Sequence, residues 1–269
     1  MTTPATTCAP ATDLGWQRRS PWSGILHGLG AIGLNAVGVA PGGAVDFLPG
    51  CRSVVVFGSG GPSLWSAFTK AIVADPTVLT AHAHPLDRFI ARTLATVDPA
   101  PDGRHRVWVR CAFDAERFVD FRPLARSAGL GWDSPLGLLL HPKHGPWMGL
   151  RAACFTTEAL PVSGVLPEPG PCASCPAPCQ RACPVSAVPS RVGPRFDIRA
   201  CASHKQGGGC HAHCKARQAC PQGAASAYPV LEQAYHDDRK TGRTALAAAL
   251  RIGADGHIGE GPYWSDWAD

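Results

Sequence analysis

The sequence predicts a protein of the mixed α/β or α+β class, with a larger α/β domain followed by a small cysteine-rich domain. In residues 21–165, strand-like apolar runs alternate with segments of helical periodicity, the pattern of domains that pack helices against a sheet. In residues 166–225, eight of the chain's 12 cysteines lie close together. Residues 1–20 are rich in Thr, Ala and Pro and predict a disordered leader, whereas residues 226–269 predict a helical tail.

Local patterns predict the elements of the α/β domain in order. A helix over residues 22–33 leads into a strand over residues 36–40. Residues 52–57 form a continuous valine-rich run, which suits a strand buried on both faces. The segment 84–97 carries apolar residues at helical spacing. The remaining predicted elements are a strand at 104–110, a helix at 113–128, strands at 137–141 and 147–157, and tail helices at 230–236 and 241–250.

Composition restricts the functional class. The chain has 269 residues, of which 45% are hydrophobic and 17% are charged, so it can bury a sizeable core without disulfides. No run of about eighteen apolar residues occurs, so no membrane span is predicted. The pair Arg18-Arg19 before an apolar stretch resembles a twin-arginine export signal. Pro21, Trp22 and His27 interrupt that stretch, so we predict a cytoplasmic protein.

The cysteine-rich segment carries the strongest chemical signal. Its cysteines read Cys172-x2-Cys175-x3-Cys179-x3-Cys183-Pro184, then Cys201, then Cys210-x3-Cys214-x5-Cys220-Pro221. Three closely spaced cysteines followed by Cys-Pro, seen twice, are typical of a two-cluster ferredoxin-like domain, in which the Cys-Pro thiolate crosses to the other [4Fe-4S] cluster. This crossing rule assigns one quartet to each cluster: Cys172, Cys175, Cys179 and Cys220 to the first, and Cys183, Cys201, Cys210 and Cys214 to the second. The cysteines expected to be ordinary thiols are Cys8, Cys51, Cys111 and Cys154.

Alternatives to iron–sulfur clusters stay open at this point. The gap before the third cysteine is three residues, one longer than the usual bacterial spacing. Two structural zinc sites could use the same cysteines, with a histidine as a fourth ligand from among His204, His211 and His213. Residues 168–225 also hold seven basic and two acidic residues, which suits anionic clusters, an RNA partner or a solvated basic surface.

Several motifs resemble one known superfamily. Residues 127–132 read Ser-Ala-Gly-Leu-Gly-Trp, residues 137–142 read Gly-Leu-Leu-Leu-His-Pro, and residues 156–161 read Thr-Thr-Glu-Ala-Leu-Pro. Over residues 22–225, the chain resembles the epoxyqueuosine reductase and reductive dehalogenase superfamily. The resemblance implies a nitroreductase-like domain of the cobalamin-binding type, with a two-cluster ferredoxin-like domain inserted or appended. It also implies that the two [4Fe-4S] clusters reduce a bound cobalamin.

The resemblance implies the residues of a site as well. Reduction of a C–O bond needs protons in addition to electrons, and the candidate proton donors are Asp114, Asp120, His141 and His144. The candidate cofactor-binding residues lie on the matching motifs and are Gly129, Gly131, Trp132, His141, Pro142 and Gly145. Residues 133–135 read Asp-Ser-Pro where epoxyqueuosine reductases usually have Ile-Gly-Lys, so we predict a divergent relative.

Three functional hypotheses follow. The favoured one is an iron–sulfur reductase that takes electrons from a donor such as a ferredoxin or flavodoxin and passes them to cobalamin, or to a small-molecule or tRNA substrate. The second is a ferredoxin-type electron carrier without a substrate of its own, whose α/β domain docks a partner. The third is a zinc-stabilised RNA-binding module.

Overall fold

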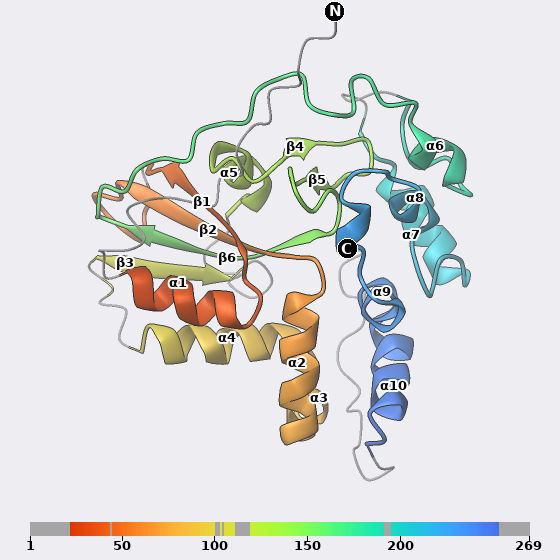
Figure 1. The fold of residues 1–269 in the computed structure, drawn as a ribbon, viewed down its shortest axis with the longest axis horizontal. Helices are drawn as coiled ribbons and strands as arrows, with labels where there is room; N and C mark the ends of the chain where they lie inside the picture. The colour runs from red at the N-terminus through yellow and green to blue at the C-terminus, as the bar shows by residue number, and fades with distance from the viewer. Residues whose placement is uncertain are drawn as a thin grey trace, which may run out of the picture.

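The computed structural model describes residues 22–43, 45–99, 103, 105–110, 119–190 and 195–252. Its centre is a four-stranded antiparallel sheet in the order β1-β2-β6-β3 (Figure 1). The strands of this sheet are β1 (Ala36–Pro41), β2 (Ser53–Gly60), β3 (Arg106–Arg110) and β6 (Met148–Thr156). A two-stranded sheet lies between it and the cysteine-rich segment, and consists of β4 (Trp132–Asp133) and β5 (Leu139–Leu140). The mixed α/β class is therefore confirmed.

Strand β2 is buried on both faces of the sheet, and all its residues are buried. Side chains along a strand alternate between the two faces. Val55 and Phe57 accordingly belong to the hydrophobic core on one face, whereas Val54 and Val56 belong to the core on the other. The prediction made from the valine-rich run is confirmed.

Helices cover both faces of the main sheet (Figure 1). Helix α1 covers one face because its apolar residues recur at helical spacing. Trp22, Ile25 and Leu29 are all buried, in the core that α1 shares with α2 and α4. Helix α5 packs on the opposite face. The helices of this part are α1 (Trp22–Ala31), α2 (Ser63–Ala74), α3 (Thr77–Thr80), α4 (Pro85–Val97) and α5 (Phe121–Ser127).

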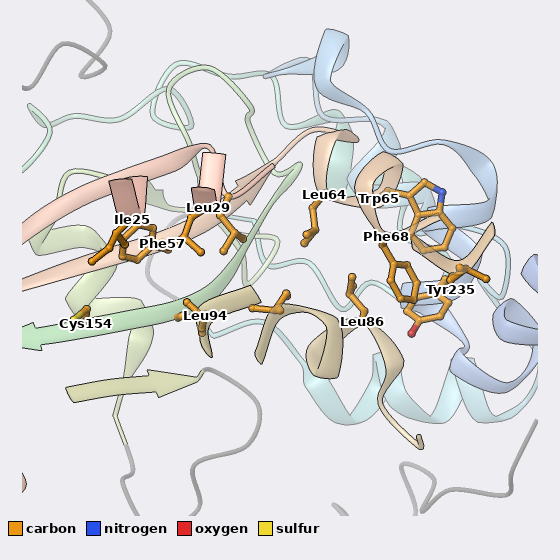
Figure 2. Close-up of a cluster of buried hydrophobic side chains, with 14 of the residues drawn as sticks. Ile25, Leu29, Phe57, Leu64, Trp65, Phe68, Leu86, Leu94, Cys154 and Tyr235 are labelled. Atoms are coloured by element: carbon orange, nitrogen blue, oxygen red, sulfur yellow. The ribbon is translucent and has the colours of Figure 1, made fainter. Parts of the chain in front are cut away.

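The carboxyl-terminal part of the described chain is helical and packs against α2. Figure 2 shows Tyr235 of α9 beside Trp65 and Phe68 of α2, and the ring centres are 5.2 and 5.9 Å apart. Arg243 of α10 donates a hydrogen bond of 2.9 Å to the carbonyl oxygen of Leu79. The helices of this part are α6 (Pro178–Ala182), α7 (Ile198–Gln206), α8 (Lys215–Gln218), the short 3-10 helix η2 (Ala224–Ser226), α9 (Val230–Asp237) and α10 (Arg239–Ala249).

The structure differs from the sequence predictions in two places. Residues 113–118 of the helix predicted over residues 113–128 lie outside the described residues. Of the described part, α5 begins at Phe121, because the carboxylate of Asp120 accepts a hydrogen bond from the backbone N–H of Arg122 and caps the helix there. Helix α2 was not predicted, although it follows the glycine-rich residues 58–62 directly. The predicted leader, residues 1–20, and residues 253–269 of the predicted tail lie outside the described residues. Within the described ranges, no helix has the length and apolar character needed to span a membrane.

Candidate functional site

The first site is a cavity of about 600 Å³ beside the β4–β5 hairpin. Trp132 from β4 and Leu140 from β5 form part of its wall. Two of its cysteines are buried and pack with Leu140 in one small apolar cluster. The four cysteines that line this cavity are Cys172, Cys175, Cys179 and Cys220.

The second site is a smaller cavity of about 50 Å³, lined by Cys183, Cys201, Cys210 and Cys214. Phe196 contributes apolar wall, and the side chains of Lys205 and Arg217 contribute positive charge. Leu136 lines both cavities, so the two sites are neighbours. The cysteines around the two cavities are the members of the two predicted quartets, and their role as ligands stays a prediction.

Helix α6 leads the chain from the first cavity to the second. Its N-cap residue, Ala177, has φ 52° and is in the left-handed region, so the chain turns sharply before the helix begins. Pro178 occupies the first helical turn, where its missing N–H is tolerated. Cys179 in that turn lines the first cavity, and Cys183 at the carboxyl end of the helix lines the second.

Helix α8 leads the chain back in the opposite direction. Cys214 is its N-cap residue and lines the second cavity, whereas Cys220, just beyond its end, lines the first.

The remaining two cysteines of the second cavity come from α7 and the loop that follows it. Cys201 lies in α7, whose first turn is capped by the carboxylate of Asp197. Cys210 directly follows the three glycines at 207–209 and is in the left-handed conformation, with φ 54°.

The chemistry of these thiols fits a metal centre that displaces their protons. Burial, together with the neighbouring thiols of the same quartet, raises the pKa of Cys172 to about 11. Burial also raises the pKa of Cys179, Cys201, Cys214 and Cys220. Bound metal would release these protons and offset the thiolate charge, and four soft sulfur donors around a cavity suit an iron–sulfur cluster. Among the described residues, no three His, Cys, Asp or Glu side chains form a group that could hold one metal ion.

The predicted proton donors lie in different environments. Asp114 is outside the described residues, and Asp120 is an exposed helix cap. The rings of His141 and His144 lie 4.9 Å apart. The Nδ1 atom of His141 accepts hydrogen bonds from the backbone N–H groups of Lys143 and His144, at 3.1 and 3.2 Å. Burial, with positive charge on His144 and Lys143, lowers the pKa of His141 to about 4, so at neutral pH its ring is uncharged.

The glycines predicted to bind a cofactor are packed against protein backbone. A Cβ atom at Gly129, Gly131 or Gly145 would come within 2.5, 2.7 and 2.0 Å of a carbonyl oxygen, respectively. Gly145 makes the closest approach, to the carbonyl oxygen of Gln222 just after the last cysteine, and its φ of 55° is one that glycine adopts readily. These glycines therefore join distant segments of the chain.

Besides the three glycines and His141, the prediction named Trp132 and Pro142, and these are engaged elsewhere or exposed. Trp132 donates its indole N–H to the carbonyl oxygen of Pro167 at 2.9 Å, and Pro142 is exposed. The described residues predicted to bind cobalamin thus do not line an open binding site for it, and their cofactor role stays a prediction.

Sequence reasoning missed a polar cluster beside the second cavity. The guanidinium carbon of Arg217 lies 4.5 Å from the ring centre of Trp147 and 4.6 Å from that of Tyr228. Glu232 of α9 is only 3% exposed, and the guanidinium charges of Arg217 and Arg151 act on it. No local pattern could have marked Glu232, because its burial depends on segments far apart in the sequence.

No protein-family model matches this sequence, and no curated protein matches it. Solved structures do match it. The chain is 13% identical to the B12-trafficking protein CblC of C. elegans, with 88% of this chain and 97% of that chain covered and a TM-score of 0.57. It is 16% identical to a catabolic reductive dehalogenase, covering 95% of this chain and 39% of that one, with a TM-score of 0.52. It is 14% identical to epoxyqueuosine reductase from Bacillus subtilis, covering 77% and 66%, with a TM-score of 0.50.

The fold is therefore one that reductases and a B12-trafficking protein share. At these identities the likeness concerns the fold alone, and at that level the resemblance predicted from the sequence motifs is confirmed. The chain spans just under two thirds of the epoxyqueuosine reductase and about two fifths of the dehalogenase.

Proposed function

We propose that this protein is an iron–sulfur oxidoreductase in which two [4Fe-4S] clusters relay electrons to an acceptor at the sheet domain. The observation that carries the proposal is the division of eight cysteines into two quartets, each around its own cavity. Cys172, Cys175, Cys179 and Cys220 would hold one cluster, and Cys183, Cys201, Cys210 and Cys214 the other. When bound, such clusters supply transfer of single electrons.

The residues around the quartets support this function. Leu136 and Phe196 contribute apolar wall beside the second quartet, and apolar surroundings are one of the means by which a protein adjusts the reduction potential of a cluster. Lys205 and Arg217 bring positive charge beside the second quartet and would favour its reduced state. Leu136 borders both cavities, so the two centres would be neighbours, which favours electron transfer between them.

The donor and the acceptor are the less constrained parts of the proposal. The excess of basic residues in 168–225 suits an acidic one-electron donor of the ferredoxin or flavodoxin class. Cobalamin is the acceptor to test first, because two fold neighbours are a B12-trafficking protein and a reductive dehalogenase that carries out B12-dependent dehalogenation. The described glycines do not cradle it, so we assign no chemical step to it.

Metal analysis of the full chain, purified without air, tests the proposal. We expect about eight iron and about eight acid-labile sulfide ions per chain, and a paramagnetic signal after reduction with dithionite. The matched control is Cys51→Ser, which removes a thiol outside both quartets and should keep the full iron content. Zinc in place of iron and sulfide would overturn the proposal and favour the zinc-stabilised module.

A second measurement separates a reductase from a simple electron carrier. Cobalamin is added to the reduced, cluster-loaded protein, and its absorption spectrum is followed. Spectral change at stoichiometric cobalamin supports a corrinoid acceptor, whereas an unchanged spectrum with both clusters present favours the carrier.

A further inference from the structure

A buried acid lies beside the second cysteine cavity. Glu232, in the first turn of α9, is 3% exposed. Its Oε2 atom is buried and has no hydrogen-bond partner among the described residues. Its Oε1 atom lies 3.8 Å from Nε2 of His236, one helical turn later, whose side chain is 24% exposed. A carboxyl group in this position is costly to ionise, and its neighbour His236 is partly exposed to solvent.

Charged groups face Glu232 from two other elements. Arg151 reaches it from β6 and Arg217 from α8, and Tyr228, just before α9, is buried against Arg217. The two arginines favour the carboxylate, but burial is the larger effect and raises the pKa of Glu232 to about 8. Near neutral pH the acid therefore keeps its proton, and a modest change in local charge is enough to alter its protonation.

Arg217 connects this acid with the second cavity. It lines the cavity together with the four cysteines, and its charge acts on Glu232. Two hydrogen bonds to the carbonyl oxygen of Pro146, of 3.1 and 2.7 Å, and stacking on Trp147 hold its guanidinium in place. Because little water screens charges in this buried region, negative charge added at the cavity is felt at Glu232.

We propose, on the basis of the proposed function, that Glu232 is a proton-binding site that, in mildly alkaline solution where it is ionised, takes up one proton when the second centre gains one electron. The electron comes from a one-electron donor of the ferredoxin class, and the proton comes from solvent past His236. The carboxylate becomes a carboxylic acid, so one added negative charge is matched by one added proton. When the electron leaves for the acceptor, Glu232 returns the proton. The coupling is reciprocal: a protonated Glu232 makes the centre easier to reduce.

Redox titration of the full, cluster-loaded chain tests this inference. The midpoint potentials of both clusters are measured by paramagnetic resonance from about pH 6 to about pH 10. The cluster whose signal disappears in the double variant Cys201→Ala/Cys214→Ala is the second centre. Its potential should be level below about pH 8 and should fall as the pH rises further, because ionised Glu232 opposes reduction. The potential of the first centre should change less over the same range.

Two variants separate proton binding from a structural role. Glu232→Gln keeps the shape of the side chain and removes its titration, so the potential of the second centre should stay level across the range. Asp46→Asn removes an exposed carboxylate and should keep the fall. A fall that persists in Glu232→Gln, or a wild-type potential that does not depend on pH, would overturn the inference.

Infrared difference spectroscopy gives an independent readout in the unmodified chain. Reduction at about pH 9 should produce the carbonyl band of a protonated carboxylic acid, and its absence would overturn the inference even if Glu232→Gln fails to fold. A chain that binds no iron and sulfide would instead contradict the proposed function, so the two failures are distinguishable.

Discussion

The guanidinium carbon of Arg217 lies 4.5 Å above the centre of the Trp147 ring. Trp147 immediately precedes β6, and Arg217 belongs to α8, which leads the chain from one cysteine cavity to the other. Two hydrogen bonds from the same guanidinium to the carbonyl oxygen of Pro146 reinforce the contact. One planar side chain thus attaches the cysteine-rich segment to the end of the central sheet.

Replacing Arg217 by lysine should weaken this attachment although the charge is retained. Lysine cannot donate two parallel hydrogen bonds from a planar group or stack on two rings. We expect Arg217→Lys to lower the free energy of unfolding by about 1–3 kcal/mol. The measurement is denaturant unfolding followed by tryptophan fluorescence. Arg181→Lys is the control, because exposed Arg181 makes a single hydrogen bond to a backbone carbonyl, and its loss should cost under about 1 kcal/mol. Equal losses in the two variants would contradict the assigned role.

Paired cysteine substitutions should reveal which cysteines share a centre. Replacing Cys172 and Cys220 together removes two ligands of one quartet, so about four iron ions per chain should remain. Replacing Cys172 and Cys214 together damages both quartets, so iron should be lost from both centres. Iron and sulfide analysis decides between the outcomes, and similar iron contents in the two double variants would refute the crossed assignment.

Alanine at Gly145 should destabilise the joint between the sheet domain and the last cysteine. Its φ of 55° is unfavourable for alanine by about 1–3 kcal/mol, and its Cβ would also meet the backbone of Gln222. We expect a lower melting temperature and faster loss of iron. Gly24→Ala is the control, since nothing lies within 4 Å of that helical position and alanine there should be neutral or stabilising by up to about 1 kcal/mol. A Gly145→Ala chain as stable as this control would contradict the prediction, because the backbone would then accept a Cβ atom at residue 145 without loss of stability.

Partly buried His141 predicts a loss of stability in mild acid. The pKa of His141 is about 4 in the folded chain against an ordinary value of 6.5. Between these values the unfolded chain binds a proton that the folded chain does not, so the contribution is present above pH 6.5 and is lost as the pH falls toward 4. We expect about 1–3 kcal/mol, measured by unfolding over this pH range.

His141→Asn should reduce that pH dependence, because asparagine can still accept the two backbone hydrogen bonds but does not titrate. His27→Asn, at an exposed position of α1, should leave the dependence unchanged. The same loss in acid for His141→Asn and the unmodified chain would assign the effect to other groups.

Local sequence patterns predicted most of the regular structure. The valine-rich run at 52–57 and the apolar spacing of 84–97 correctly predicted β2 and α4. Both signals are local, because the burial of a strand or of one helix face requires apolar residues at regular positions close in sequence. The start of α5 was missed because a helix-like pattern continues past the Asp120 cap that begins the helix. The β4–β5 hairpin is too short for any periodicity to show.

The candidate site was predicted in part for the same reason. The grouping of the cysteines could be predicted from their spacing. The short helices α6 and α8 each have a cysteine of one quartet near one end and a cysteine of the other quartet near the other end. The roles of Gly131 and Gly145 could not be predicted from spacing, because the carbonyl groups they approach belong to other segments.

The amino-acid sequence alone determined the strands and helices whose apolar pattern is local, such as β2 and α4, because that pattern depends on residues close in sequence. The crossing rule, and not closeness in sequence, predicted that Cys220 lines the same cavity as Cys172. Only the tertiary structure decided that Glu232 is buried with Arg151 and Arg217, three residues that come from β6, α8 and α9. Burial of a charged group and the resulting pKa depend on which distant segments exclude water from it, and that exclusion exists only after the chain has folded.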